Sequence, residues 1–344
     1  MMTRLRCGWT LALAFVLTTQ PAHAHEKWFT DSSSFPIRWS EVFSAKTGLV
    51  LLAVGAGLAA AYAADALRRR MQLEPGIRLS HRQLELMFSW TPLLLGIHAA
   101  VPLLVSGLQL NLFAPNLPLP RNLGGGLLAL AEITIALSFL YGALTRVFAL
   151  LLLALIPMGF LVLPPAYVLE HLDLAGIAAF LFITGRGPFS VDALIGPPSR
   201  PSIRLLPHAV TALRMLTGAA IVVLGFTEKI WNEQLAQGFL VYQDFNLLET
   251  VGLDNATFIL LAGVVEVLVG AVLISGKLTR LVIALAWIPF NLTLPFLGWV
   301  ELVGHLSIYG TMVVLLLWGP GQDLEPYVDA LSRVPTAEPA NEPV

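Results

Sequence analysis

Charged residues are scarce in this sequence. Lysine, arginine, aspartate and glutamate make up 12% of its 344 residues, hydrophobic residues make up 56%, and the mean hydropathy is +0.77. Soluble globular chains carry about a quarter charged residues, so this composition excludes an ordinary water-soluble domain. The formal net charge of -2 gives no basic excess for nucleic acid. The composition therefore predicts a protein with several membrane-spanning segments.

Cysteine is nearly absent as well, since the sequence contains only Cys7. This residue lies in a stretch with the pattern of a secretory signal peptide: Arg4 and Arg6 precede a short apolar run, and Ala22-His23-Ala24 forms an A-x-A cleavage site. We expect residues 1–24 to be a signal peptide that is removed, and the alternative is an uncleaved signal anchor. The mature chain would then have no thiol for disulfides, iron–sulfur ligation or covalent haem attachment.

The common nucleotide and hydrolase motifs are missing too. The sequence contains no G-x-x-x-x-G-K-[ST], no Rossmann fingerprint, no H-E-x-x-H and no G-x-S-x-G. Nucleotide chemistry would therefore require a partner chain.

Nine apolar stretches follow the signal peptide. Each must be helical, because lipid offers no partner for unpaired backbone groups, and most have the roughly 17 to 25 residues needed to cross a bilayer. The sequence therefore predicts an all-α polytopic membrane protein with nine transmembrane helices, embedded in the lipid bilayer of the cell (inner) membrane. The predicted helices cover residues 47–67, 86–108, 124–142, 147–163, 169–185, 208–227, 256–275, 278–297 and 300–319.

The basic residues predict the orientation of these helices. If the mature chain starts on the outer face, the outer loops of the helical body carry only Arg121 and Lys229, and the remaining loop arginines and lysines fall inside, as the positive-inside rule requires. The longest outer loop, residues 228–255, is acidic. Nine spans place residues 325–344 in the cytoplasm, where their proline and glutamate content predicts a disordered tail.

An internal repeat runs through the helical region at a displacement of 134 residues. Four helices per copy keep both copies in the same orientation, so the repeat is parallel, with its axis along the membrane normal. We expect two four-helix units, residues 86–190 and 205–324, after residues 25–67, which hold an extracytoplasmic segment and the first transmembrane helix. The matched positions include residues 142–146 with 276–280, Glu132 with Glu266, and His171 with His305.

Each unit has a glutamate in the middle of its second helix and a histidine near the start of its fourth. A carboxylate at that depth costs about 3 kcal/mol on insertion scales, so Glu132 and Glu266 should face the bundle interior and either find a partner or stay protonated. In a four-helix bundle, His171 and His305 would lie about one or two turns away from them. Two interpretations follow: a glutamate–histidine relay for protons or a quinone head group, and an interhelical hydrogen bond that only holds each bundle together.

The second unit carries more charge than the first. Arg214 lies early in its first helix, Glu228 and Lys229 lie at the outer end of that helix, and Glu301 lies one turn before the histidine. We expect the charged groups at the outer end to converge with the glutamate and the histidine of this unit near the outer leaflet. The alternative is that Lys229 and the following Trp231 form an interfacial anchor.

The predicted mature N-terminus adds a metal hypothesis. Cleavage after Ala24 would leave His25 first, and a terminal amine with an imidazole is a chelate suited to copper. Another ligand is needed, and the histidines near the outer face are His171 and His305. Such a site would make the chain a metal-handling or small-solute membrane protein. A further alternative is a membrane scaffold that binds an extracytoplasmic partner through residues 228–255.

Small residues and single charges give the second unit a recognisable pattern. The pattern consists of Arg214, Gly218, Gly225 and Glu228-Lys229, then Glu266 with Gly270, then residues 276–280, then the closing stretch 305–319. Through this pattern, residues 208–321 resemble the DoxX-like family of four-helix membrane proteins, and residues 86–188 do so more weakly. This family is similar to the membrane subunit of thiosulfate:quinone oxidoreductase, so the resemblance implies a redox process, a quinone ligand and a redox partner protein. It points to Arg214, Lys229, Glu266 and His305, and the first unit lacks the glutamate–lysine pair.

Overall fold

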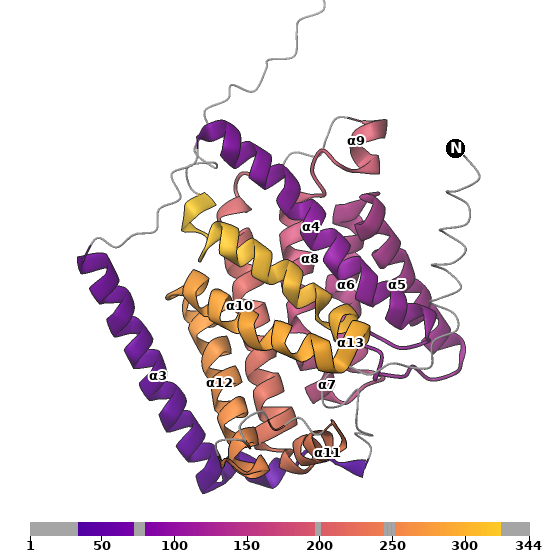
Figure 1. Cartoon of the computed structure of the whole chain (residues 1–344). Coiled ribbons are helices and arrows are strands. Elements are labelled where there is room, and N and C mark those ends of the chain that lie inside the picture. Colours follow the sequence, from indigo (N-terminus) through magenta and orange to yellow (C-terminus); the bar gives the residue numbers. More distant parts are fainter. Residues whose placement is uncertain are drawn as a thin grey trace, which may run out of the picture.

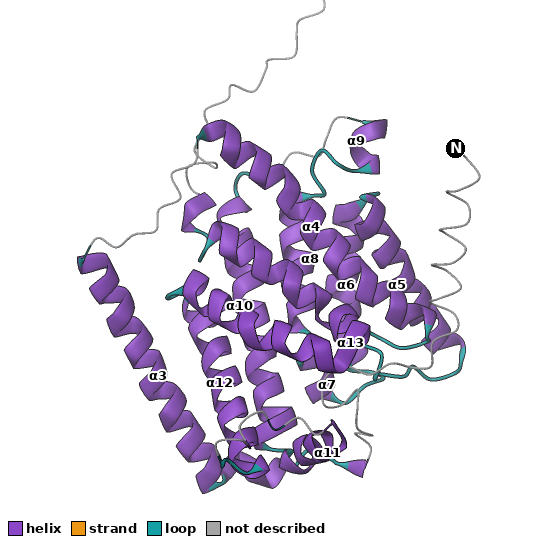
Figure 2. Ribbon diagram, viewed as in Figure 1, coloured by secondary structure: helices purple, strands orange, loops and turns teal. Residues whose placement is uncertain are grey.

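The computed structural model describes residues 34–71, 80–196, 201–243, 246, 249 and 252–324. Within these ranges the helices form an all-α fold, as predicted, and a single isolated bridge joins Asn111 to Pro118 (Figure 2). The predicted signal peptide, His25 and the tail 325–344 lie outside the described residues. The elements are η2 (Trp39–Phe43), α3 (Ala45–Arg70), α4 (His81–Leu108), α5 (Leu123–Tyr141), α6 (Thr145–Gly159), α7 (Pro165–Leu169), α8 (Leu172–Thr184), α9 (Val191–Ile195), α10 (Leu206–Leu224), η3 (Gly225–Ile230), α11 (Glu233–Gln243), α12 (Asn255–Ser275), α13 (Thr279–Trp318) and η5 (Gln322–Leu324).

Six of the described helices are long and apolar enough to cross a membrane, which is the architecture of a multi-pass membrane protein. They are α3, α4, α5, α10 with η3, α12, and the last part of α13 over Glu301–Trp318. Helices α6 and α8 and the stretch Thr279–Leu292 have only 10–17 residues each. At a rise of about 1.5 Å per residue they are shorter than the roughly 30 Å hydrocarbon core.

Helix α13 runs without interruption for 40 residues where two helices were expected, yet it folds back on itself (Figure 1). In a straight helix Arg280 and Leu316 would lie about 54 Å apart, at about 1.5 Å per residue. Instead, Arg280 Nε donates a hydrogen bond of 2.8 Å to the Leu316 carbonyl, and the Phe290 ring lies 4.9 Å from the His305 ring. The two halves are therefore antiparallel neighbours. The bend therefore falls between Phe290 and His305, a stretch that contains Pro295, whose backbone has no N–H to donate.

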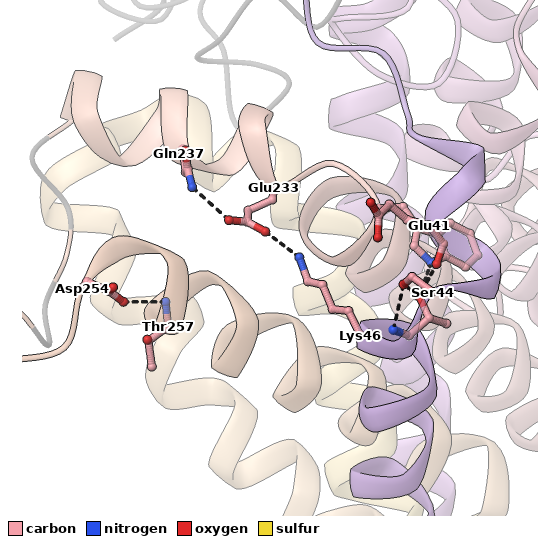
Figure 3. A network of polar contacts seen from close by, with 9 residues as sticks. Glu41, Ser44, Lys46, Glu233, Gln237, Asp254 and Thr257 are labelled. Carbon is pink, nitrogen blue, oxygen red and sulfur yellow. Dashed lines mark hydrogen bonds and ion pairs between the residues drawn. The ribbon is translucent and has the colours of Figure 1, made fainter.

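Helix α3 lies at the edge of the bundle, beside α12 (Figure 1). A narrow stripe of α3 that includes Val50 and Val54 packs against α12 and η3, while Leu49 and Leu52 are exposed. Polar contacts hold both ends. At the C-terminal end of α3, Asp65 lies 3.5 Å from Lys277. At its N-terminal end, Lys46 bonds to Glu233 at 2.6 Å, and Figure 3 shows this pair. A helix with so little buried surface is expected to face lipid on its remaining sides.

Four arginines cover the carbonyls at the C-terminal ends of helices, where backbone acceptors have no helical partner and the helix dipole favours a cation. From the sequence, Arg214 was expected at the functional site, and the three loop arginines served only to predict the orientation. In the structure they close the ends of α5, α8, α12 and the second half of α13. The contacts are Arg186 to Phe139 and Leu140, Arg146 to Ile183, Arg214 to Leu273 and Ile274, and Arg280 to Leu316 and Leu317.

Helices α10 and α12 approach each other closely at Gly218 and Gly270, two of the glycines behind the family resemblance. A Cβ atom on Gly270 would lie 2.5 Å from the Gly218 carbonyl oxygen. We expect Gly270→Ala to lower the free energy of unfolding by about 2 kcal/mol, because the helices must separate. Gly55→Ala is the control, since nothing lies within 4 Å of its Cβ position. Equal thermal unfolding of the two variants in detergent would contradict this prediction.

Candidate functional site

The C-terminal end of α10 continues directly into the π-helical turn η3. Single π turns of this kind are frequent at functional sites. This one points two nearby side chains in different directions: Thr227 Oγ1 donates to Glu170 Oε1 at 2.5 Å, towards the first predicted unit, and Lys229 Nζ lies 2.9 Å from Glu266 Oε1, towards α12. Glu228, between them, is buried. The turn therefore places consecutive polar residues inside the bundle.

The Lys229–Glu266 ion pair lies deep in an apolar setting. Glu266 follows the first residue of α12 by eleven positions, about 16 Å along the helix axis. Gly225 makes room for it, because a Cβ atom there would lie 3.3 Å from the Glu266 Cβ. Oε2 of Glu266 is buried and has no hydrogen-bond partner among the described residues. We expected His305 as the partner of this glutamate, and the structure pairs it with Lys229.

His305 pairs with a residue of its own helix. Its Nδ1 atom lies 3.2 Å from Glu301 Oε1, one turn earlier, and both side chains are buried. The His305 imidazole and the Glu228 carboxylate lie within electrostatic range of Glu266. Five residues thus gather at the end of the predicted second unit that the sequence predicts to be outer: Glu228, Lys229, Glu266, Glu301 and His305. We call these five residues the outer cluster.

The corresponding residues of the first unit are arranged differently. Glu132 is fully buried, and its Oε1 accepts a hydrogen bond of 2.7 Å from the backbone N–H of Phe113. His171 Nδ1 donates to the Tyr167 carbonyl at 2.8 Å, and its ring lies 6.0 Å from the Phe113 ring. Both residues therefore hold the loop around Phe113, instead of contacting each other directly as expected. The geometry of this pair favours the structural interpretation.

Two buried acids that the sequence analysis did not select connect the first unit to the second. Besides the Glu170–Thr227 bond, Asp173 Oδ2 accepts a hydrogen bond of 3.0 Å from Ser307 on α13. Both acids flank His171 in the sequence. Their spacing alone would not have found them, because acids at the first turn of a helix are common and are usually solvated.

Arg214 lies away from the outer cluster. It precedes Lys229 by 15 residues on the same helical segment, which corresponds to about 22 Å at 1.5 Å per residue. Its guanidinium instead caps the C-terminal end of α12 beside Gly276. Arg214 therefore has a structural contact, and the geometry does not support the site role that the resemblance implied.

The copper hypothesis gains no support from the described residues. Among them, no group of three or more histidine, cysteine, aspartate or glutamate side chains is arranged to hold a metal ion. His25, the residue behind the copper hypothesis, lies outside the described part of the chain.

Comparison of the chain with protein-family models, with curated proteins and with solved structures finds no match. The resemblance to DoxX-like proteins therefore depends only on the residues named above.

Proposed function

We propose that this protein is an integral membrane component of a redox process and binds a quinone head group at the outer cluster. One observation carries the proposal: Glu266, in the middle of the apolar helix α12, forms an ion pair with Lys229 of η3. Ionisable side chains are expensive at that depth, and in membrane proteins they are usually functional. Quinones are lipid-soluble and carry carbonyl oxygens that accept hydrogen bonds, so their chemistry suits this environment.

Each residue of the outer cluster has a role in the proposal. Lys229 donates to a quinone carbonyl, and Glu266 and His305 exchange protons with the head group. Glu301 orients the His305 ring through the 3.2 Å contact. The electrons come from a redox partner protein, because the sequence carries no recognisable motif for a bound redox centre.

We further propose that the signal peptide is cleaved and that the mature chain begins on the outer side and crosses the membrane nine times. We also propose that its helices form two parallel repeats. Several backbone features recur at the displacement of 134 residues and support the repeat. Gly142 and Gly276 have φ angles of 71° and 72°, and Leu144 and Leu278 have φ angles of 52° and 49°. In addition, Arg146 donates to the Ile183 carbonyl as Arg280 donates to Leu317.

The proposal is tested by binding of decylubiquinone to the full-length protein in nanodiscs, followed by quenching of tryptophan fluorescence. We expect Glu266→Gln and His305→Ala each to weaken binding by at least tenfold, since hydrogen bonds to charged groups contribute about 1.5 to 3 kcal/mol. Glu132→Gln is the matched control, because an amide oxygen still accepts the Phe113 N–H.

Thermal unfolding of each variant separates lost binding from lost folding. Unchanged binding in both Glu266→Gln and His305→Ala would remove the quinone site. An equal loss in Glu132→Gln would show that the effect is not specific to the outer cluster.

A further inference from the structure

The side chain of Glu266 in the outer cluster is only partly covered by protein, although its Oε2 atom is buried. In the Lys229–Glu266 pair, 37% of the glutamate side chain is exposed, against 13% of the lysine. Successive residues of an α-helix are separated by about 100°, which places Glu266 on the border between two faces of α12. Gly263 and Gly270 on one face pack against α10 and η3, and Val265 on the other face is 56% exposed. The exposed part of Glu266 therefore adjoins an apolar surface.

The two long edges of α12 differ in what covers them. On one edge, Leu268 fills the space at Gly57 of α3. Glu266 lies towards the other edge, where Val269 and Leu273 pack into the same core as Trp287 of α13. Helix α13 contacts α12 and carries His305, which lies within electrostatic range of Glu266, so α13 is the neighbour of Glu266 towards this edge.

The first half of α13 is also apolar where it is exposed. Leu285 and Ile288 are 57% and 63% exposed, and they belong to the same half as Trp287. The exposed surface on both sides of Glu266 thus consists of aliphatic side chains. Surfaces of this kind on membrane helices face hydrocarbon, whereas a path from the aqueous side would be lined by polar groups.

We infer that the ligand reaches Glu266 sideways from the hydrocarbon, along the edge of α12 that faces α13, and not from the outer aqueous phase. The ligand class is a lipid-soluble amphipathic molecule whose polar head meets Lys229 and Glu266 while its apolar tail stays between Val265 and Ile288. This inference deepens the proposed quinone function and rests on it for the identity of the head group. The direction of access follows from the exposed apolar surfaces of α12 and α13 and does not depend on the identity of the head group.

Spin labels on single cysteines test the direction of access. With Cys7→Ser as background, Ala262→Cys and Val269→Cys place labels one turn before and after Glu266. The full-length protein is labelled in detergent and reconstituted into phosphatidylcholine–phosphatidylglycerol vesicles, and collision rates with oxygen and with a water-soluble nickel chelate are measured. Val265→Cys serves as the lipid-facing control, Val267→Cys as the buried control and Gln234→Cys as the aqueous control.

We expect the labels at residues 262 and 269 to collide at least fivefold more with oxygen than with nickel, as the label at residue 265 does. If the nickel collision rates at residues 262 and 269 approached the rate at residue 234, they would show an aqueous path and overturn the inference. Low collision rates with both reagents, as at residue 267, would show that the edge is closed and would also overturn it.

Addition of decylubiquinone to the same vesicles separates this inference from the proposed function. We expect the oxygen collision rate at residue 262 to fall by at least twofold, with no change at residue 265. If the labels face lipid and decylubiquinone changes nothing, the lateral opening stands and the quinone function is wrong. If decylubiquinone binds and the labels report water, the function stands and the direction of access is wrong.

Discussion

Lys229→Met is expected to lower the free energy of unfolding by on the order of 3 kcal/mol, because it leaves the Glu266 carboxylate without its cation in an apolar environment. The 2.9 Å contact to Lys229 is the ion pair that the structure assigns to this glutamate. Methionine is similar to lysine in length, so the apolar packing of the stem is largely kept and the change isolates the charge. Unfolding of the purified protein in detergent, followed by circular dichroism, measures the effect.

The double variant Lys229→Met with Glu266→Gln should recover most of this loss, because no uncompensated charge remains. Lys46→Met is the matched control: Lys46 in the first turn of α3 pairs at 2.6 Å with Glu233, the first residue of α11, but about 30% of each side chain is exposed (Figure 3). It should cost less than about 1 kcal/mol. A double variant no more stable than Lys229→Met alone would show that the pair is not the source of the effect.

Arg186→Met is expected to destabilise the protein to a similar degree, by about 3 kcal/mol, since it removes two charge-assisted hydrogen bonds from buried carbonyls. Arg186 Nε and Nη2 donate to Phe139 and Leu140 at 2.9 Å and 3.2 Å, at the end of α5. Burial lowers the pKa of this guanidinium to about 10, so it is still charged at neutral pH. The same unfolding measurement applies.

Two further variants sharpen the test of Arg186. Arg186→Lys keeps the charge but lacks the planar fork, so it should lose an intermediate amount of stability. Arg204→Met changes an exposed arginine of the same region and should change the free energy of unfolding by less than about 0.5 kcal/mol. If Arg186→Met and Arg204→Met unfold alike, the cap at the end of α5 contributes nothing.

The positions of the helices were largely predictable from the sequence, while their lengths and bends were less so. Apolar runs without charges are helical in lipid whatever their neighbours are. The predicted helices 278–297 and 300–319 form the two halves of α13, joined through a bend near Pro295. The short helix α11 and the π turn η3 were not predicted, because both depend on contacts with distant segments, such as the Lys46–Glu233 pair for α11.

Composition and hydropathy by themselves determined that this chain is all-α, that its long apolar helices suit a bilayer, and that Glu132 and Glu266 need partners. These conclusions follow from the high free energy of unpaired polar groups in hydrocarbon, which does not depend on how the helices pack. Tertiary structure alone decided which partner each acid has: the Phe113 backbone for Glu132 and Lys229 for Glu266. Partner choice depends on how far each helix is rotated about its axis and on local features such as the π turn, and a pattern of periodic apolar residues determines neither.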